Sequence, residues 1–167
     1  MVGKLQDKRA WLNLQYSQIS KITSMADWRF DKYLFEGNKK AVTKAFQALD
    51  SPLKTDRSQW KDENFLRGSP DWLGYIIIEL LRNSLDDFLC RGTFRLTSDN
   101  IFQMKPGICG FKVEADSTWT PSVSLFQAIA ESFGITLYYH SIGEWDDEII
   151  FTNDEDGLVF PELKFAQ

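Results

Sequence analysis

Apolar residues alternate with polar ones in several short segments of the chain. This alternation predicts strands at 28–36, 92–97, 110–117, 135–140 and 148–152, with a short edge strand at 158–160. The clearest segment is 110–117, where Phe111, Val113 and Ala115 alternate with charged residues. Residues 1–25 fit a strand and a helix about equally well, so the pattern assigns them to neither.

Two further segments have apolar residues at helical spacing. Asn38 is a favourable N-cap, and the helix after it is expected to end before Ser51 because Pro52 disfavours a helical residue ahead of it. Ser69 followed by proline favours a second helix start, and the apolar positions extend this helix over 70–89.

A third helix is expected after Thr120, which can cap it, with Pro121 at its first position. It should end at Phe133, because Gly134 can adopt the left-handed conformation that closes many helices. Lys105-Pro106-Gly107 predicts a turn between two of the strands.

The order of these elements is that of a ferredoxin-like α+β sandwich, an antiparallel sheet with helices on one face. One extra helix and extra C-terminal strands would complete it. No internal repeat occurs, so residues 1–167 are expected to form a single domain. Within it, 1–25 would be an N-terminal extension and 51–69 a polar insertion.

Charge is distributed unevenly along the 167 residues. The whole chain carries a formal net charge of -5, to which residues 1–140 contribute +2 and residues 141–167 contribute -7. A strongly negative region such as 141–167 repels phosphate backbones and attracts basic surfaces. The candidate partner-binding residues are Glu144, Trp145, Asp146, Asp147, Glu148, Asp154, Glu155 and Asp156. The alternative is that these acids only keep the protein soluble.

Location and redox state follow from what the sequence lacks. Its longest apolar runs are far shorter than the roughly 20 residues that span a membrane, and the first 30 residues contain no apolar block of signal-peptide length. A cytoplasmic location is therefore expected. Cys90 and Cys109 form no CxxC pair, so neither a zinc site nor a disulfide framework is indicated.

Catalytic and metal-binding patterns are weak. His140 is the only histidine, expected at a strand end, and no nucleophile motif accompanies it. The acids at 154–156 resemble a calcium loop, but two of the required ligand positions fail, and a turn closed by Gly157 explains them. Glu114 and Asp116 would share a strand face and could hold Mg²⁺, as could Asp146 with Glu148, but the acidic region lacks substrate-binding cations. We therefore expect no enzymatic activity, metal or cofactor.

Nucleic-acid binding is the main alternative to protein binding. Phe94, Phe111, Tyr138 and Tyr139 could stack on bases if they lay exposed on the sheet, although core packing explains them better. Several basic residues within 39–57 could contact phosphates: Lys39, Lys40, Lys44, Lys54 and Arg57.

The segments 112–122 and 125–133, a strand leading through Trp119-Thr120-Pro121 into a helix, resemble the YubB-type ferredoxin-like domain. This family consists of largely uncharacterised proteins carried on plasmids, phages and related mobile elements. The resemblance covers roughly residues 92–157, and Arg91-Gly92-Thr93-Phe94 stands where family members often have Trp-Gly-Thr-Lys-Trp. It implies a fold and an origin in a mobile element, and no catalytic residues.

These observations lead to two hypotheses. In the first, the protein is a non-enzymatic interaction module whose acidic residues bind a basic surface of a host protein, inhibiting a nucleic-acid-binding or defence protein by charge mimicry. In the second, it binds nucleic acid through the sheet face or the basic residues of 39–57.

Overall fold

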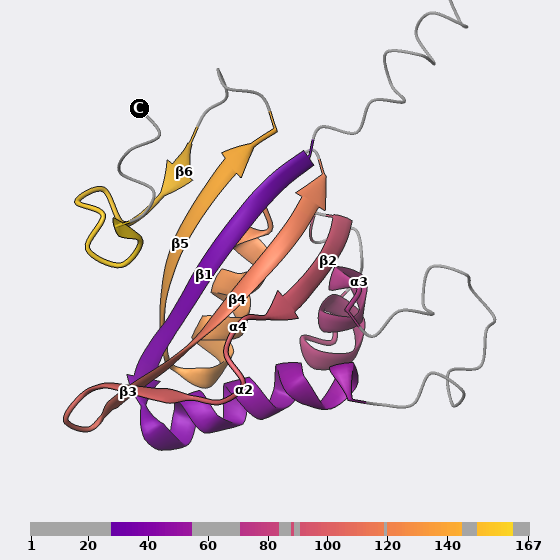
Figure 1. The fold of residues 1–167 in the computed structure, drawn as a ribbon. Helices are drawn as coiled ribbons and strands as arrows, with labels where there is room; N and C mark the ends of the chain where they lie inside the picture. The colour runs from indigo at the N-terminus through magenta and orange to yellow at the C-terminus, as the bar shows by residue number, and fades with distance from the viewer. Residues whose placement is uncertain are drawn as a thin grey trace, which may run out of the picture.

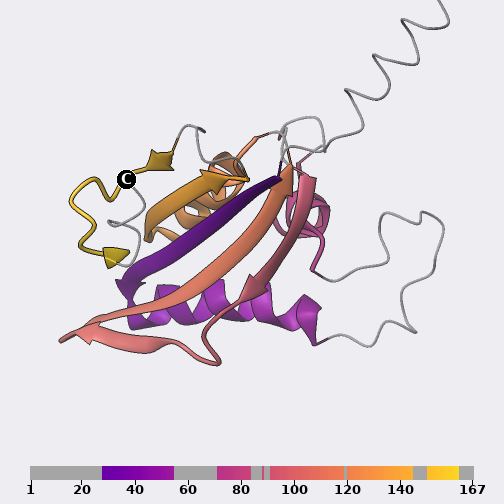
Figure 2. The same cartoon turned by 45° about the horizontal axis from the view of Figure 1, so that its top comes forward.

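The computed structural model describes residues 28–54, 71–83, 88, 91–118, 120–144 and 150–161. They form an α+β fold in which helices lie against one face of an antiparallel sheet (Figures 1 and 2). The strands are β1 (Trp28–Asn38), β2 (Arg91–Leu96), β3 (Phe102–Lys105), β4 (Ile108–Thr118), β5 (Thr136–Gly143) and β6 (Phe151–Thr152). The helices are α2 (Lys39–Leu53), α3 (Leu73–Tyr75), which continues as the π-helical turn η3 (Ile76–Leu80), and α4 (Val123–Phe133).

Strand β1 lies at the centre of the six-stranded sheet. The order is β2-β4-β1-β5-β6, and β3 also pairs with β4, at the opposite end of β4 from β2. Every pairing is antiparallel; in the central register Tyr33 lies opposite Val113 on β4 and Tyr139 on β5. The strands expected at 28–36, 92–97, 110–117 and 135–140 are confirmed, with β4 and β5 longer than expected.

The two faces of the sheet have different surroundings. Because side chains alternate along a strand, the odd-numbered residues of β1 face the helices, and the even-numbered ones lie on the other side, which we call the open face. The rings of Phe35 and Phe111 stack with centroids 4.7 Å apart, and Tyr33 packs on Phe126 of α4 at 4.3 Å. All four are fully buried, so these rings form the centre of the core.

Helix α2 begins where the sequence predicts. The side-chain oxygen of Asn38 accepts a hydrogen bond from the N–H of Ala41 at 2.9 Å. The expected end before Ser51 is wrong, because α2 continues to Leu53 with Pro52 in its last turn. Pro52 is buried against the core, and this packing offsets the single backbone hydrogen bond that its ring removes.

The helix expected over 70–89 is much shorter in the described part of the chain. It starts at Leu73 and ends after η3, because Arg82 has a φ of 58°, in the left-handed region. Three successive isoleucines begin η3, and β-branched side chains crowd the preceding helical turn. The expected cap, Ser69, lies outside the described residues.

Helix α4 is capped differently from the prediction. It begins at Val123, so Thr120 is not its cap, and the Ser122 side chain caps no helical N–H either. Instead Asp31 of β1 accepts hydrogen bonds from the backbone N–H of Ser122 at 2.9 Å and from its hydroxyl at 2.6 Å. At the other end Gly134 has a φ of 63°, which confirms the left-handed C-terminus.

Asp31 also joins α4 to the two central strands. The same carboxylate oxygen accepts hydrogen bonds from the hydroxyls of Tyr33 at 3.1 Å and Ser117 at 2.9 Å. The hydroxyls of Tyr33 and Ser122 lie 2.7 Å apart. All four side chains are buried, so this network has a structural role and offers no surface to a substrate.

Strand β3 is the strand that the sequence pattern does not reveal. It pairs with the start of β4 across the expected turn, with Phe102 opposite Gly110. Phe102-Gln103-Met104-Lys105 does alternate apolar and polar residues, but the strand has only four residues and is largely exposed, so this short alternation does not by itself identify a strand.

The C-terminal part departs most from the expectation. Strand β5 continues to Gly143, three residues beyond the strand expected at 135–140. Within the described residues the strand expected at 148–152 consists of Phe151 and Thr152 alone. The edge strand expected at 158–160 is wrong, because its backbone N–H groups bind a carboxylate rather than another strand.

None of the described helices is long and apolar enough to cross a membrane. The 1–25 extension and most of the 51–69 insertion lie outside the described residues.

Candidate functional site

Residues 144–156, which we call the acidic segment, are described at their two ends. Glu144 follows β5, and its N–H donates to the carbonyl oxygen of Trp28 at 2.9 Å. Asp154 follows β6, which runs antiparallel to β5, so the two ends lie roughly 20 Å apart along the sheet edge at 3.3 Å per residue. The other candidates Trp145, Asp146, Asp147 and Glu148 lie outside the described residues.

Asp154 organises the loop that follows β6. Its carboxylate accepts hydrogen bonds from the backbone N–H groups of Leu158, Val159 and Phe160 at 2.8 to 3.0 Å. The N–H of Gly157, whose φ is 56°, donates to the Asp154 carbonyl at 2.9 Å. The turn closed by Gly157 is therefore confirmed, and Asp154 holds it in place.

The residues that this turn displays are exposed. Glu155 and Asp156 lie at its tip, and Leu158 has 80% of its surface exposed. Within the described residues neither acid forms an ion pair, and the same holds for Glu144. We call residues 154–158 the acidic turn.

The side chain of Asn153 closes the sheet edge beside this turn. Its oxygen accepts a hydrogen bond from the N–H of Tyr139 at 2.8 Å, and its NH₂ donates to the carbonyl of Leu137 at 2.8 Å. It thus binds the edge of β5 as the backbone of a neighbouring strand would. The edge at these two residues is occupied and cannot be extended by a strand from another chain.

His140 lies within β5 rather than at its end, because the strand continues to Gly143. Its side chain is buried, with its ring centroid 6.4 Å from that of Phe160. Cys109 is a buried free thiol, and Cys90 lies outside the described residues. Both of these described side chains are largely shielded from solvent.

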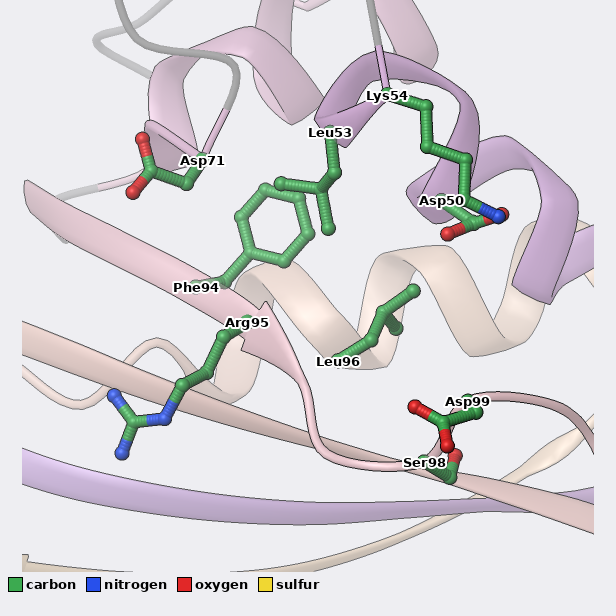
Figure 3. A pocket seen from close by; sticks show the side chains of 9 residues that line it. All are labelled: Asp50, Leu53, Lys54, Asp71, Phe94, Arg95, Leu96, Ser98 and Asp99. Atoms are coloured by element: carbon green, nitrogen blue, oxygen red, sulfur yellow. The ribbon is translucent and has the colours of Figure 1, made fainter.

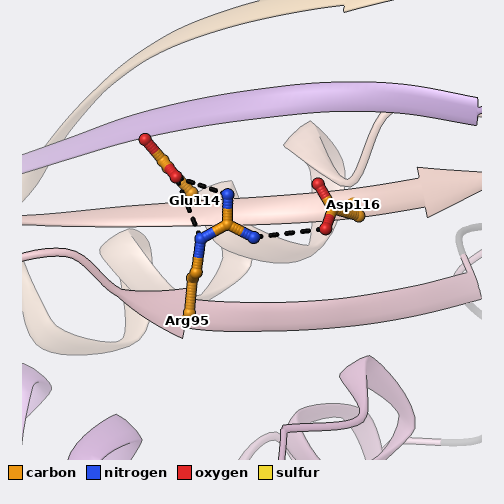
Figure 4. A network of polar contacts seen from close by, with 3 residues as sticks. All are labelled: Arg95, Glu114 and Asp116. Carbon is orange, nitrogen blue, oxygen red and sulfur yellow. Dashed lines mark hydrogen bonds and ion pairs between the residues drawn. The ribbon is translucent and has the colours of Figure 1, made fainter. Parts of the chain in front are cut away.

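Glu114 and Asp116 share the open face, as predicted, but an arginine binds both (Figure 4). Arg95 of β2 makes contacts of 2.6 and 3.0 Å to one Glu114 oxygen and 3.2 Å to Asp116. These carboxylates raise the pKa of Arg95, chiefly through the Glu114 hydrogen bond. No group of three or more potential ligands that could hold a metal ion occurs among the described residues.

The aromatic residues weighed for base stacking lie mostly in the core. Phe94 and Phe111 are buried against the helices, and Tyr139 packs against the same core. Among the aromatic side chains exposed on the open face are instead those of Trp28 and Phe30, 40% and 51% exposed. The alternation along β1 places them on the opposite face from Tyr33 and Phe35, but both faces carry apolar residues, so the pattern does not tell which face is open.

Basic residues gather at the beginning of α2. Lys39, Lys40 and Lys44 are exposed and form no ion pair within the described residues, whereas Lys54 pairs with Asp50 at 2.6 Å. A groove of about 300 Å³ is lined by Asn38, Lys40, Ala41, Lys44, Ser132 and Phe133.

A larger pocket of about 560 Å³ lies between the end of α2 and β2 (Figure 3). Its base is apolar, formed by Leu53, Phe94 and Leu96, and both acidic and basic side chains surround it. Two of its lining residues, Lys54 and Asp71, border residues 55–70 in sequence, and that segment is outside the described part of the chain, so the outline of the pocket gives no basis for a ligand.

The placement of Tyr138 beside Glu36 on the open face can be tested through the pKa of the Tyr138 hydroxyl. Burial raises its pKa above the ordinary 10.0, and the nearby carboxylate of Glu36 raises it further. The folded chain therefore holds this proton more tightly than the unfolded chain, and the associated stability is lost as pH rises through and above 10. Glu36→Gln is expected to lower the pKa of Tyr138, measured by ultraviolet titration against Tyr138→Phe. An unchanged value, as expected for the control Glu131→Gln, would contradict the contact.

Comparison of the chain with protein-family models, curated proteins and solved structures gives no match.

Proposed function

We propose that the protein is a non-enzymatic interaction module that binds a basic protein surface through its acidic segment. The observation that carries this proposal is the set of exposed carboxylates of Glu144, Glu155 and Asp156, which form no ion pair within the described residues. Unpaired carboxylates favour the approach of a cationic surface and fix its orientation.

The acidic turn adds preorganisation to this charge. Three backbone hydrogen bonds to Asp154 hold Glu155 and Asp156 at a defined position. A partner then loses less free energy to ordering the loop than it would with a flexible tail.

The fold type, the origin of the protein and its site of action are part of the same proposal. The strand order β5-β1-β4-β2, with α2 and α4 on one face, supports a ferredoxin-like fold. The YubB-type resemblance supports an origin in a mobile element, and a cytoplasmic site of action is part of the same proposal. In that setting the partner would be a host nucleic-acid-binding or defence protein, inhibited because the acidic segment occupies the place of its nucleic acid.

The test is binding of a fluorescent nona-arginine peptide over a series of salt concentrations. The triple variant Glu144→Gln, Glu155→Gln, Asp156→Asn is expected to bind about tenfold more weakly at low salt, with a shallower salt dependence. The charge-matched control neutralises three exposed acids elsewhere, namely Glu79, Asp99 and Glu131. If both variants weakened nona-arginine binding equally, the effect would come from net charge alone and the proposal would be wrong.

A second candidate function is nucleic-acid binding, favoured by Lys39, Lys40 and Lys44 on α2, which are exposed and form no ion pair with any residue that the structure describes. A labelled oligo-dT strand tests it, since each lysine that contacts a phosphate steepens the salt dependence. Binding that is lost in the triple Lys→Gln variant would establish this function in place of the first.

A further inference from the structure

The acidic turn combines charge with an exposed apolar side chain. Glu155 and Asp156 are exposed, and Leu158, two residues later, is 80% exposed. The N–H of Leu158 is fixed by Asp154 at 2.9 Å. A leucine held this far into solvent loses hydrophobic stabilisation that burial in a partner would recover.

The groove beside α2 has the complementary character. Lys40 and Lys44 are one helical turn apart and therefore lie on the same side of α2. Ala41 and Phe133, both partly buried, supply apolar surface between α2 and the end of α4. The volume of about 300 Å³ exceeds the roughly 150 Å³ that accommodates a benzene-sized group.

Neither surface is satisfied by another part of the chain that the structure describes. In the described residues Lys40 and Lys44 form no ion pair, and neither do Glu155 and Asp156. Figure 1 shows the loop after β6 outside the β5 edge, whereas the groove lies in the helix layer. Leu158 is exposed rather than seated in that groove.

We propose that the acidic turn of one copy docks in the groove beside α2 of a second copy. Leu158 would contact Ala41 and Phe133, while Glu155 and Asp156 would pair with Lys40 and Lys44. The charges of the turn and the groove are opposite in sign, both carry apolar surface, and the groove is large enough for a leucine side chain. Because both surfaces belong to the same chain, a second copy is the occupant that the observations support. The inference uses the acids of the proposed function but does not require a host protein.

This contact is expected to be weak. Exposed ion pairs contribute little individually and are screened by salt, and a single leucine supplies the apolar area. Self-association should therefore be measured by sedimentation equilibrium at protein concentrations of about 1 mM and ionic strength of about 0.02 M. We expect the average mass to rise with protein concentration and to fall to that of a single chain at high salt.

Charge reversal gives the decisive experiment. A turn variant, Glu155→Lys with Asp156→Lys, and a groove variant, Lys40→Glu with Lys44→Glu, should each lose self-association. An equimolar mixture of the two should regain it, because each reversed surface then meets its complement. Lys105→Glu with Lys112→Glu, exposed lysines outside the groove, should leave it unchanged.

The outcomes separate this inference from the proposed function. If the groove variant associates as strongly as the native chain, or the mixture stays monomeric, the inference is wrong, whatever the nona-arginine result. If the mixture associates while nona-arginine binding does not depend on the acidic segment, the inference stands and the proposed function fails. Leu158→Ser should weaken association with no change in charge; an unchanged association would remove the leucine from the contact.

Discussion

Replacing Asp31 by alanine should lower the free energy of unfolding by about 3 kcal/mol, one of the two largest effects expected in the chain. The substitution leaves the buried hydroxyls of Tyr33, Ser117 and Ser122 without the acceptor they share, and the Ser122 N–H without its partner. Unsatisfied buried donors cost more than the hydrogen bond itself contributes, because water cannot replace the lost acceptor.

Denaturant unfolding measures this loss of stability, and two further variants serve as comparisons. Asp99→Ala removes an exposed acid and should change stability by less than about 0.5 kcal/mol. Asp31→Asn keeps one acceptor oxygen at nearly the same place and should cost less than the alanine variant. A change below about 1 kcal/mol in Asp31→Ala would show that the network contributes little to α4.

Helix α4 illustrates what the sequence could and could not predict. Its length follows from apolar spacing and from Gly134, both of which are local signals, and the structure agrees with them. The residue before its first turn, Ser122, is held by Asp31, 91 residues earlier, and no local pattern reports such a contact. The Thr120-Pro121 pair favoured an earlier start, whereas the helix begins at Val123.

The acidic segment shows a similar limit in the candidate site. Composition treats Asp154, Glu155 and Asp156 as equivalent charges. The structure separates them, since Asp154 binds three backbone N–H groups while the other two face solvent. A turn was predictable from Gly157, but the identity of the acid that holds it depends on the path of the chain after β6.

Strand content followed burial rather than propensity. The sequence located β1, β4 and β5 because one or both of their faces are buried, which imposes a regular pattern. It missed β3, whose residues are largely exposed. It placed a strand at 158–160, where Leu158 instead ends the acidic turn in solvent and Phe160, after the turn, is buried.

Gly92→Ala is expected to destabilise the protein by about 3 kcal/mol through backbone strain and a steric clash. Gly92 has a φ of 148°, and a Cβ there would lie 1.9 Å from the carbonyl oxygen of Asp116. That oxygen belongs to the backbone of β4, which pairs with β2 in this register. The clash can be relieved only by moving one strand away from the other.

Gly107→Ala is the matched control for this substitution. Gly107 also has a positive φ, 78°, but no atom lies within 4 Å of the added Cβ, so only the conformational cost of about 1 kcal/mol applies. The difference between the two variants in denaturant unfolding therefore isolates the contact between β2 and β4. Hydrogen exchange should become faster in β2, including at the Phe94 N–H, which donates to the backbone carbonyl oxygen of Asp71 at 2.8 Å. If the two glycine variants proved equally stable, β2 would have to be free to shift without loss, and the Arg95 contacts that it carries would not be a fixed part of the open face.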